Sequence, residues 1–275
     1  MAFDDAEPPY DRYATAYRDW WGPVIAPSAV RLLDSVGVPA GDQAQFQLLD
    51  VGTGTGALAL GALARWPRVE VTGVDPSMRM LDLAAEGADR LGDGAVRRLR
   101  LLQGRADRLP MGNDSMDVAI SSFVIQLVPS RAAALREIGR VLRPGGRFAC
   151  LTWQAESNPF EPDDAFLMAL DELEIDVPPM DHEARPYTSP EAAAAELRRA
   201  GFERVQARIE WLEHRYTPES FLEVLEHWIE SDLFDSLERQ MQQRLRSRTL
   251  EKLRGLPADV FVWRRPLISV AGDLR

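Results

Sequence analysis

The sequence LLDVGTGTG, from Leu48 to Gly56, decides the fold. An apolar run typical of a buried strand, Phe46–Val51, passes directly into this glycine-rich turn, and the apolar helical pattern Ala57–Arg65 follows it. A ligand can approach glycine backbone closely because no Cβ stands in the way, and the first turn of a helix offers free N–H groups. A loop of this kind favours a nucleotide-like ligand at the carboxyl edge of a parallel sheet.

Apolar runs and amphipathic segments alternate on both sides of this loop. The predicted strands are 46–51, 69–74, 99–103, 116–121, 147–153, 202–216 and 260–270. The predicted helices are 57–65, 77–90, 131–141 and 189–200, with a long helical region over 217–253. This order predicts an α/β fold with a Rossmann-like, seven-stranded, mostly parallel sheet and helices on both faces. Pro266 predicts an edge position or a bulge in the last strand.

Composition and charge narrow the classes of protein. The 275 residues are 45% hydrophobic and 27% charged, as in an ordinary folded domain. The net charge of −11 argues against a nucleic-acid partner. The acidic, proline-containing start does not resemble a signal peptide, and no apolar run approaches the roughly 18 residues of a membrane span. We therefore expect a cytoplasmic protein with no membrane partner. The single cysteine, Cys150, is expected to be a buried thiol.

An acidic residue ends the second predicted strand. Asp75 lies 21 positions after Gly54, where a carboxylate can accept both hydroxyls of an adenosine ribose. The combination of glycine loop and acidic strand end predicts nucleoside binding. Gly52, Gly54 and Ala57 also satisfy the looser dinucleotide pattern, so the loop alone leaves a nicotinamide cofactor open.

Four ordered segments resemble the class I S-adenosylmethionine-dependent methyltransferases, in the small-molecule subgroup that includes the quinone-biosynthesis type. They are LLDVGTGTG (48–56), GVDPSMRML (73–81), GRADRLPMGNDSMDVAISSFVIQLV (104–128) and LREIGRVLRPGGRFACLTW (135–153). The resemblance implies S-adenosylmethionine as cofactor and S-adenosylhomocysteine as product. It also implies an N-terminal helical segment (1–45) over the cofactor site, followed by a methyltransferase domain (46–275). We expect cap insertions in this domain at about 154–188 and 217–257.

The resemblance assigns the cofactor contacts position by position. Asp50 and the loop residues Gly52, Thr53 and Gly54 are expected to bind the methionine end of the cofactor. Asp75 is expected to bind the ribose. The adenine is expected to lie near Pro76, Met80, Ala106 and Asp107. Ser121 and Ser122 follow the fourth strand, where the family contacts the methionine portion. Tyr13 and Tyr17, in the N-terminal aromatic stripe, are expected to line the site as well. Arg105 replaces an acidic residue that the family often has before Ala106, which puts the usual contact to the adenine amino group in doubt.

The acceptor site is predicted less directly. Trp20, Gln126, Trp153 and His182 are the candidate acceptor-binding residues, and His182 is also the candidate general base. The family often carries histidine after the fourth strand, where this chain has Gln126 and Leu127, so a base from that place is absent. No metal is expected, because the three histidines are scattered and the cysteine stands alone.

The predicted reaction is in-line methyl transfer to a small, partly apolar organic acceptor. Oxygen is the preferred acceptor atom, with nitrogen and carbon left open. The alternatives are a non-methylating S-adenosylmethionine-binding enzyme, such as a cyclase or isomerase, and a nicotinamide-dependent oxidoreductase. The sequence leaves open whether the protein is a monomer or a homodimer.

Overall fold

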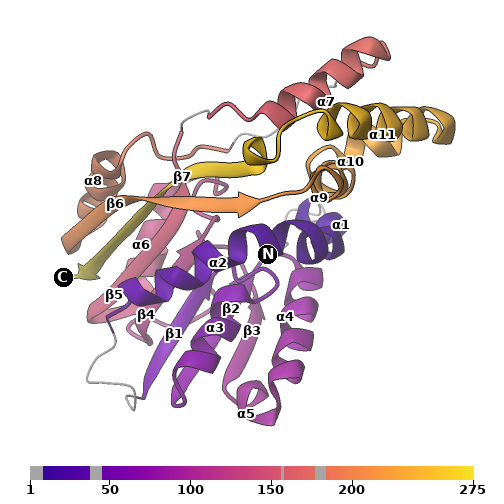
Figure 1. Cartoon of the computed structure of the whole chain (residues 1–275). Coiled ribbons are helices and arrows are strands. Elements are labelled where there is room, and N and C mark those ends of the chain that lie inside the picture. The colour runs from indigo at the N-terminus through magenta and orange to yellow at the C-terminus, as the bar shows by residue number, and fades with distance from the viewer. Residues whose placement is uncertain (1–8, 38–44, 156–157, 177–183) are drawn as a thin grey trace.

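One seven-stranded sheet forms the centre of the computed structural model, which describes residues 9–37, 45–155, 158–176 and 184–275 (Figure 1). The strand order is β3-β2-β1-β4-β5-β7-β6. The strands are β1 (Phe46–Val51), β2 (Val69–Asp75), β3 (Leu99–Gln103), β4 (Met116–Ser122), β5 (Leu142–Trp153), β6 (Phe202–Arg215) and β7 (Val262–Leu274). Strands β1 to β5 pair in parallel, and β7 runs antiparallel to both β5 and β6. The predicted Rossmann-like, mostly parallel sheet is confirmed.

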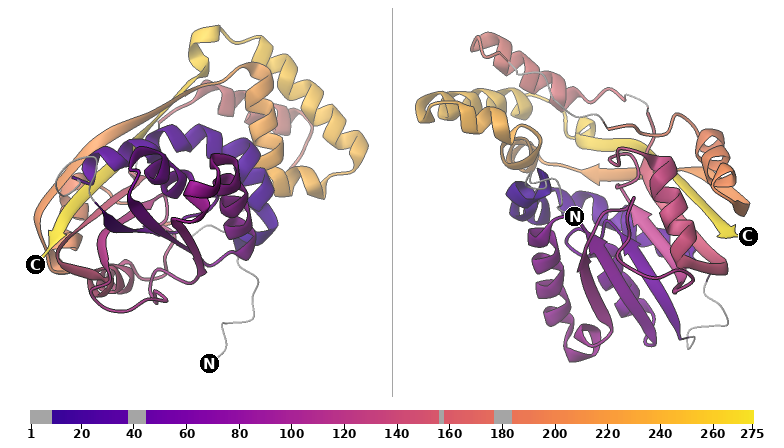
Figure 2. Two further views of the ribbon diagram at one scale, coloured as in Figure 1. Left: turned by 90° about the horizontal axis from the view of Figure 1, so that it is seen from below. Right: turned by 180° about the vertical axis from the view of Figure 1, so that it is seen from behind.

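The helices lie on both faces of this sheet and beyond one of its ends (Figure 2). The N-terminal segment contains α1 (Pro9–Ala16), the π-helical turn η1 (Tyr17–Trp21), α2 (Gly22–Arg31) and the 3₁₀ turn η2 (Leu32–Ser35). The helices between strands are α3 (Ala57–Arg65), α4 (Met78–Leu91), α5 (Asp93–Val96), α6 (Arg131–Val141) and α8 (Pro190–Arg199). The remaining helices are α7 (Glu161–Glu172), α9 (Pro218–Val224), η3 (Leu225–Ile229), α10 (Ser231–Ser236), α11 (Arg239–Arg254) and η4 (Ala258–Phe261).

Alternating side chains of the strands supply two separate cores. In β1, Phe46 and Leu48 pack on the face covered by α2 and α3, whereas Leu49 and Val51 pack on the face covered by α6 and α8. Successive side chains of a strand point to opposite faces, so a strand buried on both sides reads as a continuous apolar run. The glycine loop therefore leaves a strand that is fixed by packing on both of its faces.

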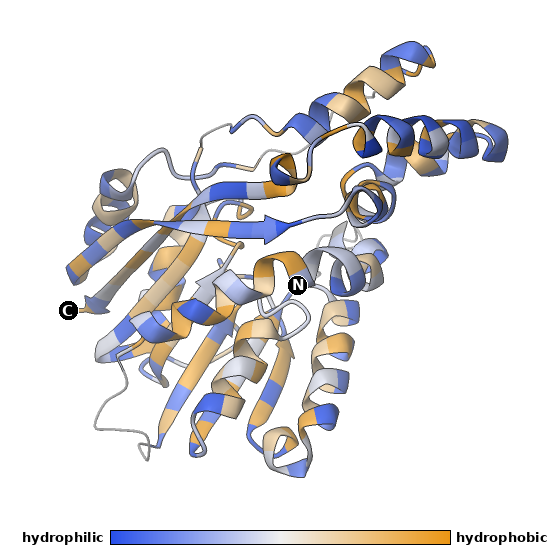
Figure 3. Cartoon of the chain, in the orientation of Figure 1, coloured by the Kyte–Doolittle hydropathy of each residue, from blue (hydrophilic) through white to orange (hydrophobic). Residues whose placement is uncertain are grey.

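The long helical region predicted over 217–253 is broken into α9, η3, α10 and α11. The chain becomes extended at Leu237, and the amide of Gln242 donates to the carbonyls of Phe234 and Leu237 at 2.7 and 3.0 Å, which satisfies carbonyls left at the break. Helices α7 and α11 pack side by side and project beyond the sheet (Figure 1). Hydropathy colouring shows that α11 is largely hydrophilic (Figure 3).

The structure tests two further predictions, one on Pro266 and one on Cys150. The predicted edge position or bulge at Pro266 is wrong: β7 lies between β5 and β6, and Pro266 pairs with Trp211 without a register shift. Proline is tolerated there because it lies beyond the last residue pair that β7 forms with β5, so its missing N–H interrupts no ladder on that side. Cys150 lies buried in β5, and burial raises the pKa of its thiol to about 12. The expected buried thiol is therefore confirmed.

Candidate functional site

The glycine loop turns sharply between β1 and α3. Gly52 and Thr53 both donate from their backbone N–H to the carbonyl of Val74, at 2.7 and 3.0 Å. Gly52 has φ +72°, and a Cβ there would stand 2.3 Å from the side chain of Val124. Gly54 has φ +53°, and a Cβ there would meet no atom within 4 Å. Gly52 is therefore required by packing, whereas Gly54 presents bare backbone to open space, as a ligand-binding loop needs.

Asp50, at the end of β1, is the most deeply buried charge of the site. Its Oδ2 accepts hydrogen bonds from the Thr53 hydroxyl at 2.8 Å and from Ala59 N–H at 3.2 Å. Its Oδ1 is buried and has no hydrogen-bond partner. Burial raises the pKa of Asp50 to about 7. An unsatisfied buried carboxylate oxygen is costly. The ammonium of a methionine moiety is the kind of donor that would satisfy it, so this residue fits the implied cofactor.

Asp75 ends the neighbouring strand β2. Its Oδ2 accepts from Gly54 N–H at 2.9 Å and its Oδ1 from Ser77 N–H at 3.0 Å. Burial raises the pKa of Asp75 to about 6. The carboxylate thus bridges the glycine loop and the start of α4, and it faces the position where two adjacent parallel strands end, which is where this class of sheet binds its ligands.

The N-terminal helix α1 packs over the start of α4. The Ser77 hydroxyl donates to Asp11, and Arg79 N–H donates to the same oxygen at 3.3 Å. Met80 is buried beneath Tyr10 and Tyr17, whose rings contact edge to face with centroids 6.3 Å apart. Burial is the largest cause of the raised pKa of each tyrosine, and the Asp75 carboxylate adds to it. Tyr10 and Tyr17 therefore lie close to Asp75.

The other residues assigned to the cofactor differ in their burial and in their hydrogen bonds. Pro76 is exposed, and its carbonyl accepts from the Gln103 amide at 3.0 Å. Both oxygens of Asp107 accept from Arg105 at 3.0 Å, which lowers the pKa of Asp107. Ala106 lies between them. The buried Ser121 hydroxyl donates to Val51 carbonyl oxygen at 2.9 Å and ties β4 to β1, and Ser122 is half-buried beside it.

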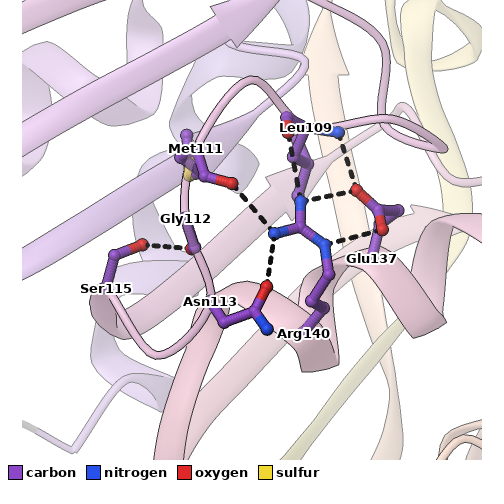
Figure 4. Close-up of polar contacts among 7 residues, drawn as sticks. All are labelled: Leu109, Met111, Gly112, Asn113, Ser115, Glu137 and Arg140. Carbon is purple, nitrogen blue, oxygen red and sulfur yellow. Dashed lines mark hydrogen bonds and ion pairs between the residues drawn. The ribbon is translucent and has the colours of Figure 1, made fainter.

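The guanidinium of Arg140 holds the loop that follows β3 (Figure 4). Arg140 on α6 donates to the carbonyls of Leu109 and Met111 at 3.1 and 2.9 Å and to the Asn113 side chain at 3.0 Å. Glu137, one turn earlier, accepts from Arg140 and from Leu109 N–H. Four hydrogen bonds with Arg140 and Glu137 therefore fix the far end of the loop that carries Ala106 and Asp107.

An aromatic cluster joins the N-terminal segment to the helices after β6. Trp228 on η3 lies at its centre, with ring centroids 5.4–6.4 Å from four partners: Tyr10, Tyr13, Tyr17 and Trp21. The hydroxyl of Tyr13 donates to Asp232 at 2.8 Å, so this tyrosine points toward α10. Tyr17, by contrast, packs against the cluster formed by Ala14, Met80 and Leu83.

A cavity of about 270 Å³ lies at the end of this cluster. Its lining residues are Trp21, Trp153, Gln154, Trp263, Arg265 and Pro266, and we call it the tryptophan cavity. The three tryptophan rings lie 5.7–6.3 Å from one another. Trp153 also contacts Phe123, at 4.8 Å, directly after the end of β4. The cavity thus adjoins the carboxyl ends of β4 and β5.

A second cavity, of about 480 Å³, lies between the start of α6 and the end of α8. Its lining includes four arginines and one glutamate: Arg131, Arg136, Arg185, Arg199 and Glu196. Arg131 is bound to both oxygens of Glu196, at 2.8 and 2.9 Å, so this pair is part of the fold.

The acceptor-binding candidates are dispersed. Trp153 lines the tryptophan cavity. Trp20 stacks on His227 at 4.8 Å. Gln126 is buried and already bonded, donating to Phe123 carbonyl oxygen at 2.6 Å and accepting from Thr152 at 2.5 Å. His182, the candidate base, lies outside the described residues.

Comparisons with known proteins agree with this geometry. Residues 49–150 match the family model of the methyltransferase domain. The ubiquinone/menaquinone biosynthesis C-methyltransferase of Syntrophotalea carbinolica is 42% identical over 119 residues, which are 41% of this chain and 46% of that protein. The matched segment therefore spans less than half the length of this curated relative.

Solved structures extend the likeness to nearly the whole fold. Phosphoethanolamine N-methyltransferase 2 of Haemonchus contortus, solved with S-adenosylhomocysteine, gives a TM-score of 0.57 at 18% identity and covers 96% of this chain and 57% of its own. The cyclase SpnF gives 0.58 at 20% identity, covering 94% and 83%. The chain carries a class I S-adenosylmethionine-dependent methyltransferase domain. S-Adenosylmethionine is the cofactor typical of this family, and the predicted family is confirmed.

Several residues at the site were not selected from the sequence. Asp11, Gln154 and Trp263 come from three distant segments, and only the fold brings them to the carboxyl edge of the sheet. The spacing of the N-terminal aromatic stripe could have pointed to Tyr10 and Trp21. Within the described ranges, no helix has the length and apolar character needed to cross a membrane.

Proposed function

We propose that this chain transfers a methyl group from S-adenosylmethionine to a small, partly apolar organic molecule. One observation carries the proposal: the buried Oδ1 of Asp50, at the end of β1, has no hydrogen-bond partner, and Gly54 in the loop that follows presents open backbone. A buried acceptor next to bare glycine backbone suits a ligand that brings a cationic donor to that point.

The chain's own residues would bind and orient the reactants. Asp50 and the loop 52–54 would hold the methionine end, Asp75 the ribose, and the segment 105–109 the adenine edge. Bound S-adenosylmethionine supplies an electrophilic methyl group, so the protein needs no covalent intermediate. The N-terminal segment, through Tyr10 and Tyr17, would exclude water from this region, and the helices after β5 and β6 would form a cap.

The acceptor atom is part of the proposal. The sequence alone favours oxygen, whereas the quinone-biosynthesis relatives are named C-methyltransferases. Mass spectrometry and NMR of the methylated product would separate these. A cytoplasmic location remains a prediction, as does the choice between monomer and homodimer.

Calorimetric titration is the first experiment. The protein would be titrated in parallel with S-adenosylmethionine, S-adenosylhomocysteine and a nicotinamide dinucleotide. We expect micromolar binding of the two adenosyl-sulfur ligands alone. Binding of the dinucleotide alone would overturn the proposal, and tight S-adenosylmethionine binding without methyl transfer to any acceptor would favour the cyclase or isomerase alternative.

Replacement of Asp75 tests the ribose assignment. Asp75→Ala should weaken S-adenosylhomocysteine binding by on the order of 1–3 kcal/mol, because it removes charged hydrogen-bond acceptors. Asp89→Ala, an exposed change on α4, the helix that follows Asp75, serves as the control and should leave the dissociation constant unchanged. An unchanged dissociation constant in folded Asp75→Ala would refute the assignment.

A further inference from the structure

The second cavity lies apart from the proposed cofactor site. It is formed by the start of α6 and the end of α8, which pack on one face of the sheet, whereas α3, the helix that follows the glycine loop, packs on the other. None of the described residues that line it is one of those assigned to the cofactor. An occupant of this cavity would therefore be a second ligand, bound at the same time as the cofactor.

The lining of the second cavity carries an excess of positive charge. Four arginines and one glutamate line it, which leaves three positive charges in excess. The chain as a whole has a net charge of −11, so this excess is opposite in sign to the charge of the rest of the molecule. A concave surface lined by one sign of charge concentrates ligands of the opposite sign. The charge of the cavity therefore favours an anionic ligand.

Arg131 and Glu196 neutralise each other within the lining. The Glu196 carboxylate accepts from Nε and Nη2 of Arg131 at 2.9 and 2.8 Å, and from the Tyr187 hydroxyl at 3.3 Å. Nη1 of Arg131 donates to the Arg185 carbonyl oxygen, and the guanidinium lies 4.7 Å from the centroid of the Tyr187 ring. This pair is bonded within the protein, so the positive charge that remains belongs to Arg136, Arg185 and Arg199.

These three arginines come from separate segments. Arg136 lies on α6, Arg199 lies on α8, and Arg185 lies in the segment that leads to α8. The backbone N–H of Arg185 donates to the Gln126 carbonyl oxygen at 2.8 Å, which ties this segment to the chain just before α6. Within the described residues, neither Arg136 nor Arg199 forms an ion pair or a side-chain hydrogen bond. Both guanidinium groups can therefore bind a ligand.

The chemistry of the guanidinium group favours a phosphate among anions. A guanidinium presents a planar set of N–H donors that binds a carboxylate or a phosphate through two parallel hydrogen bonds. A phosphate monoester carries a charge of about −1.5 to −2 at neutral pH and has three acceptor oxygens, so it can engage more than one guanidinium at once. A carboxylate has a single charge and two oxygens. Several arginines in one cavity therefore favour the phosphate.

The rest of the lining leaves room for an organic part of the ligand. Its apolar residues are Val128, Pro129, Ala132, Leu135 and Ala200. The cavity measures about 480 Å³, which lies within the range of about 300–1,000 Å³ typical of small-molecule sites. It is also much larger than the cavity of about 150 Å³ that holds benzene. Inorganic phosphate alone would leave most of this space and its apolar surface uncovered.

We propose that the second cavity binds a small organic phosphate monoester. Arg136 and Arg199 bind its phosphate group, and its organic part packs against Val128, Pro129 and Leu135. The inference does not depend on the proposed function, because S-adenosylmethionine has no phosphate group and its assigned residues lie elsewhere.

Three probe compounds test the class of ligand. The dissociation constants of n-butyl phosphate, inorganic phosphate and n-butyl sulfate would be measured by calorimetry, on the protein alone and on protein saturated with S-adenosylhomocysteine. We expect n-butyl phosphate to bind roughly tenfold more tightly than inorganic phosphate, because its alkyl chain buries apolar surface. It should bind roughly tenfold more tightly than n-butyl sulfate, which carries a single charge.

Two outcomes of these titrations would overturn the inference. The first is an affinity for n-butyl phosphate no greater than that for n-butyl sulfate, because the arginines would then not select a doubly charged group. The second is competition between n-butyl phosphate and S-adenosylhomocysteine, because the phosphate would then occupy the cofactor site. Failure of S-adenosylhomocysteine to bind would overturn the proposed function, whereas the titration of the protein alone would still test the second cavity.

Two neighbouring arginines of α8 provide a matched pair of variants. Arg199→Gln removes a charge that lines the cavity, whereas Arg198→Gln removes an exposed charge from the adjacent position outside the lining. We expect Arg199→Gln and Arg136→Gln each to weaken n-butyl phosphate binding roughly tenfold, because each removes hydrogen bonds to a charged group. Arg198→Gln should change it by less than about twofold, since an exposed charge outside the site is screened.

The comparison of these variants locates the site. Because all three arginines are exposed, each variant should unfold in urea as the unmodified protein does. Equal weakening in Arg198→Gln and Arg199→Gln would reveal an effect of overall charge and contradict the assignment. Unchanged n-butyl phosphate binding in both Arg136→Gln and Arg199→Gln would contradict it as well.

Discussion

The buried carboxylate of Asp50 suits ligand binding but lowers the stability of the folded protein. The carboxylate is buried, its Oδ1 lacks a partner, and its pKa is raised by burial. A residue selected for stability alone would be neutral or fully bonded at this position. Binding sites often retain such groups at the expense of stability. Replacement of Asp50 should therefore move stability and ligand affinity in opposite directions.

Asp50→Asn tests this through the pH dependence of stability. The folded-state pKa of about 7 exceeds the ordinary value of 3.8, so protonation favours the folded protein. This contribution is fully present below about pH 4 and is lost as the pH rises through about 7. Between pH 5 and 8, the free energy of unfolding should fall more in the unmodified protein than in Asp50→Asn, by on the order of 2 kcal/mol.

Urea unfolding at several pH values would measure the difference, and calorimetry would measure the loss of S-adenosylmethionine affinity expected in the same variant. Asp89→Asn, an exposed change, should follow the profile of the unmodified protein. Parallel profiles for all three proteins would show that Asp50 does not titrate in this range.

At the scale of single elements, the loop after β3 shows how a distant helix can position a binding segment. Arg140→Met should free this loop, because the guanidinium loses its three hydrogen bonds to the loop and the two that orient Glu137 (Figure 4). We expect S-adenosylhomocysteine affinity to fall by roughly tenfold and unfolding free energy to fall by about 2 kcal/mol. Calorimetry and urea unfolding would measure both.

The control lies one turn earlier on the same helix. Arg136→Met changes an exposed arginine at the margin of the second cavity and should alter neither quantity by more than about 0.5 kcal/mol. An unchanged S-adenosylhomocysteine affinity in Arg140→Met would mean that the loop 104–115 does not contact the ligand.

Regular elements were predictable where one local pattern dominates. β1, α3, β3 and α6 have the predicted ends, because apolar periodicity, glycine turns and a serine N-cap agree there. The π-helical turns η1 and η3 were not predicted. A π turn inserts one residue into the helical repeat, and tertiary packing selects it, so a 3.6-residue pattern does not reveal it. The same turns carry Trp21 and Trp228 into the aromatic cluster.

At the scale of the whole molecule, the residues of the candidate site also divide into those that the sequence could predict and those that it could not. The glycine loop and Asp75 were predictable because their roles depend on adjacent strand ends. Gln154 and Trp263 were not, because the antiparallel return of β7 along β5 brings them together. The aromatic cluster thus connects three parts of the chain that are far apart in sequence: the N-terminal segment, the end of β5 and the segment between β6 and β7.

Trp228→Ala tests whether this cluster couples the parts. Its ring touches four aromatic side chains of the N-terminal segment, so truncation should cost roughly 3 kcal/mol of unfolding free energy. Local opening should be greater still for α1 and α10, because fewer contacts hold them than hold the sheet. Hydrogen exchange should accelerate in both helices together while β1 to β5 stay protected. Trp211→Ala, on the exposed face of β6, should leave both helices unchanged. Faster exchange in α10 alone would show that α1 is held by Asp11 and α4, independently of the cluster.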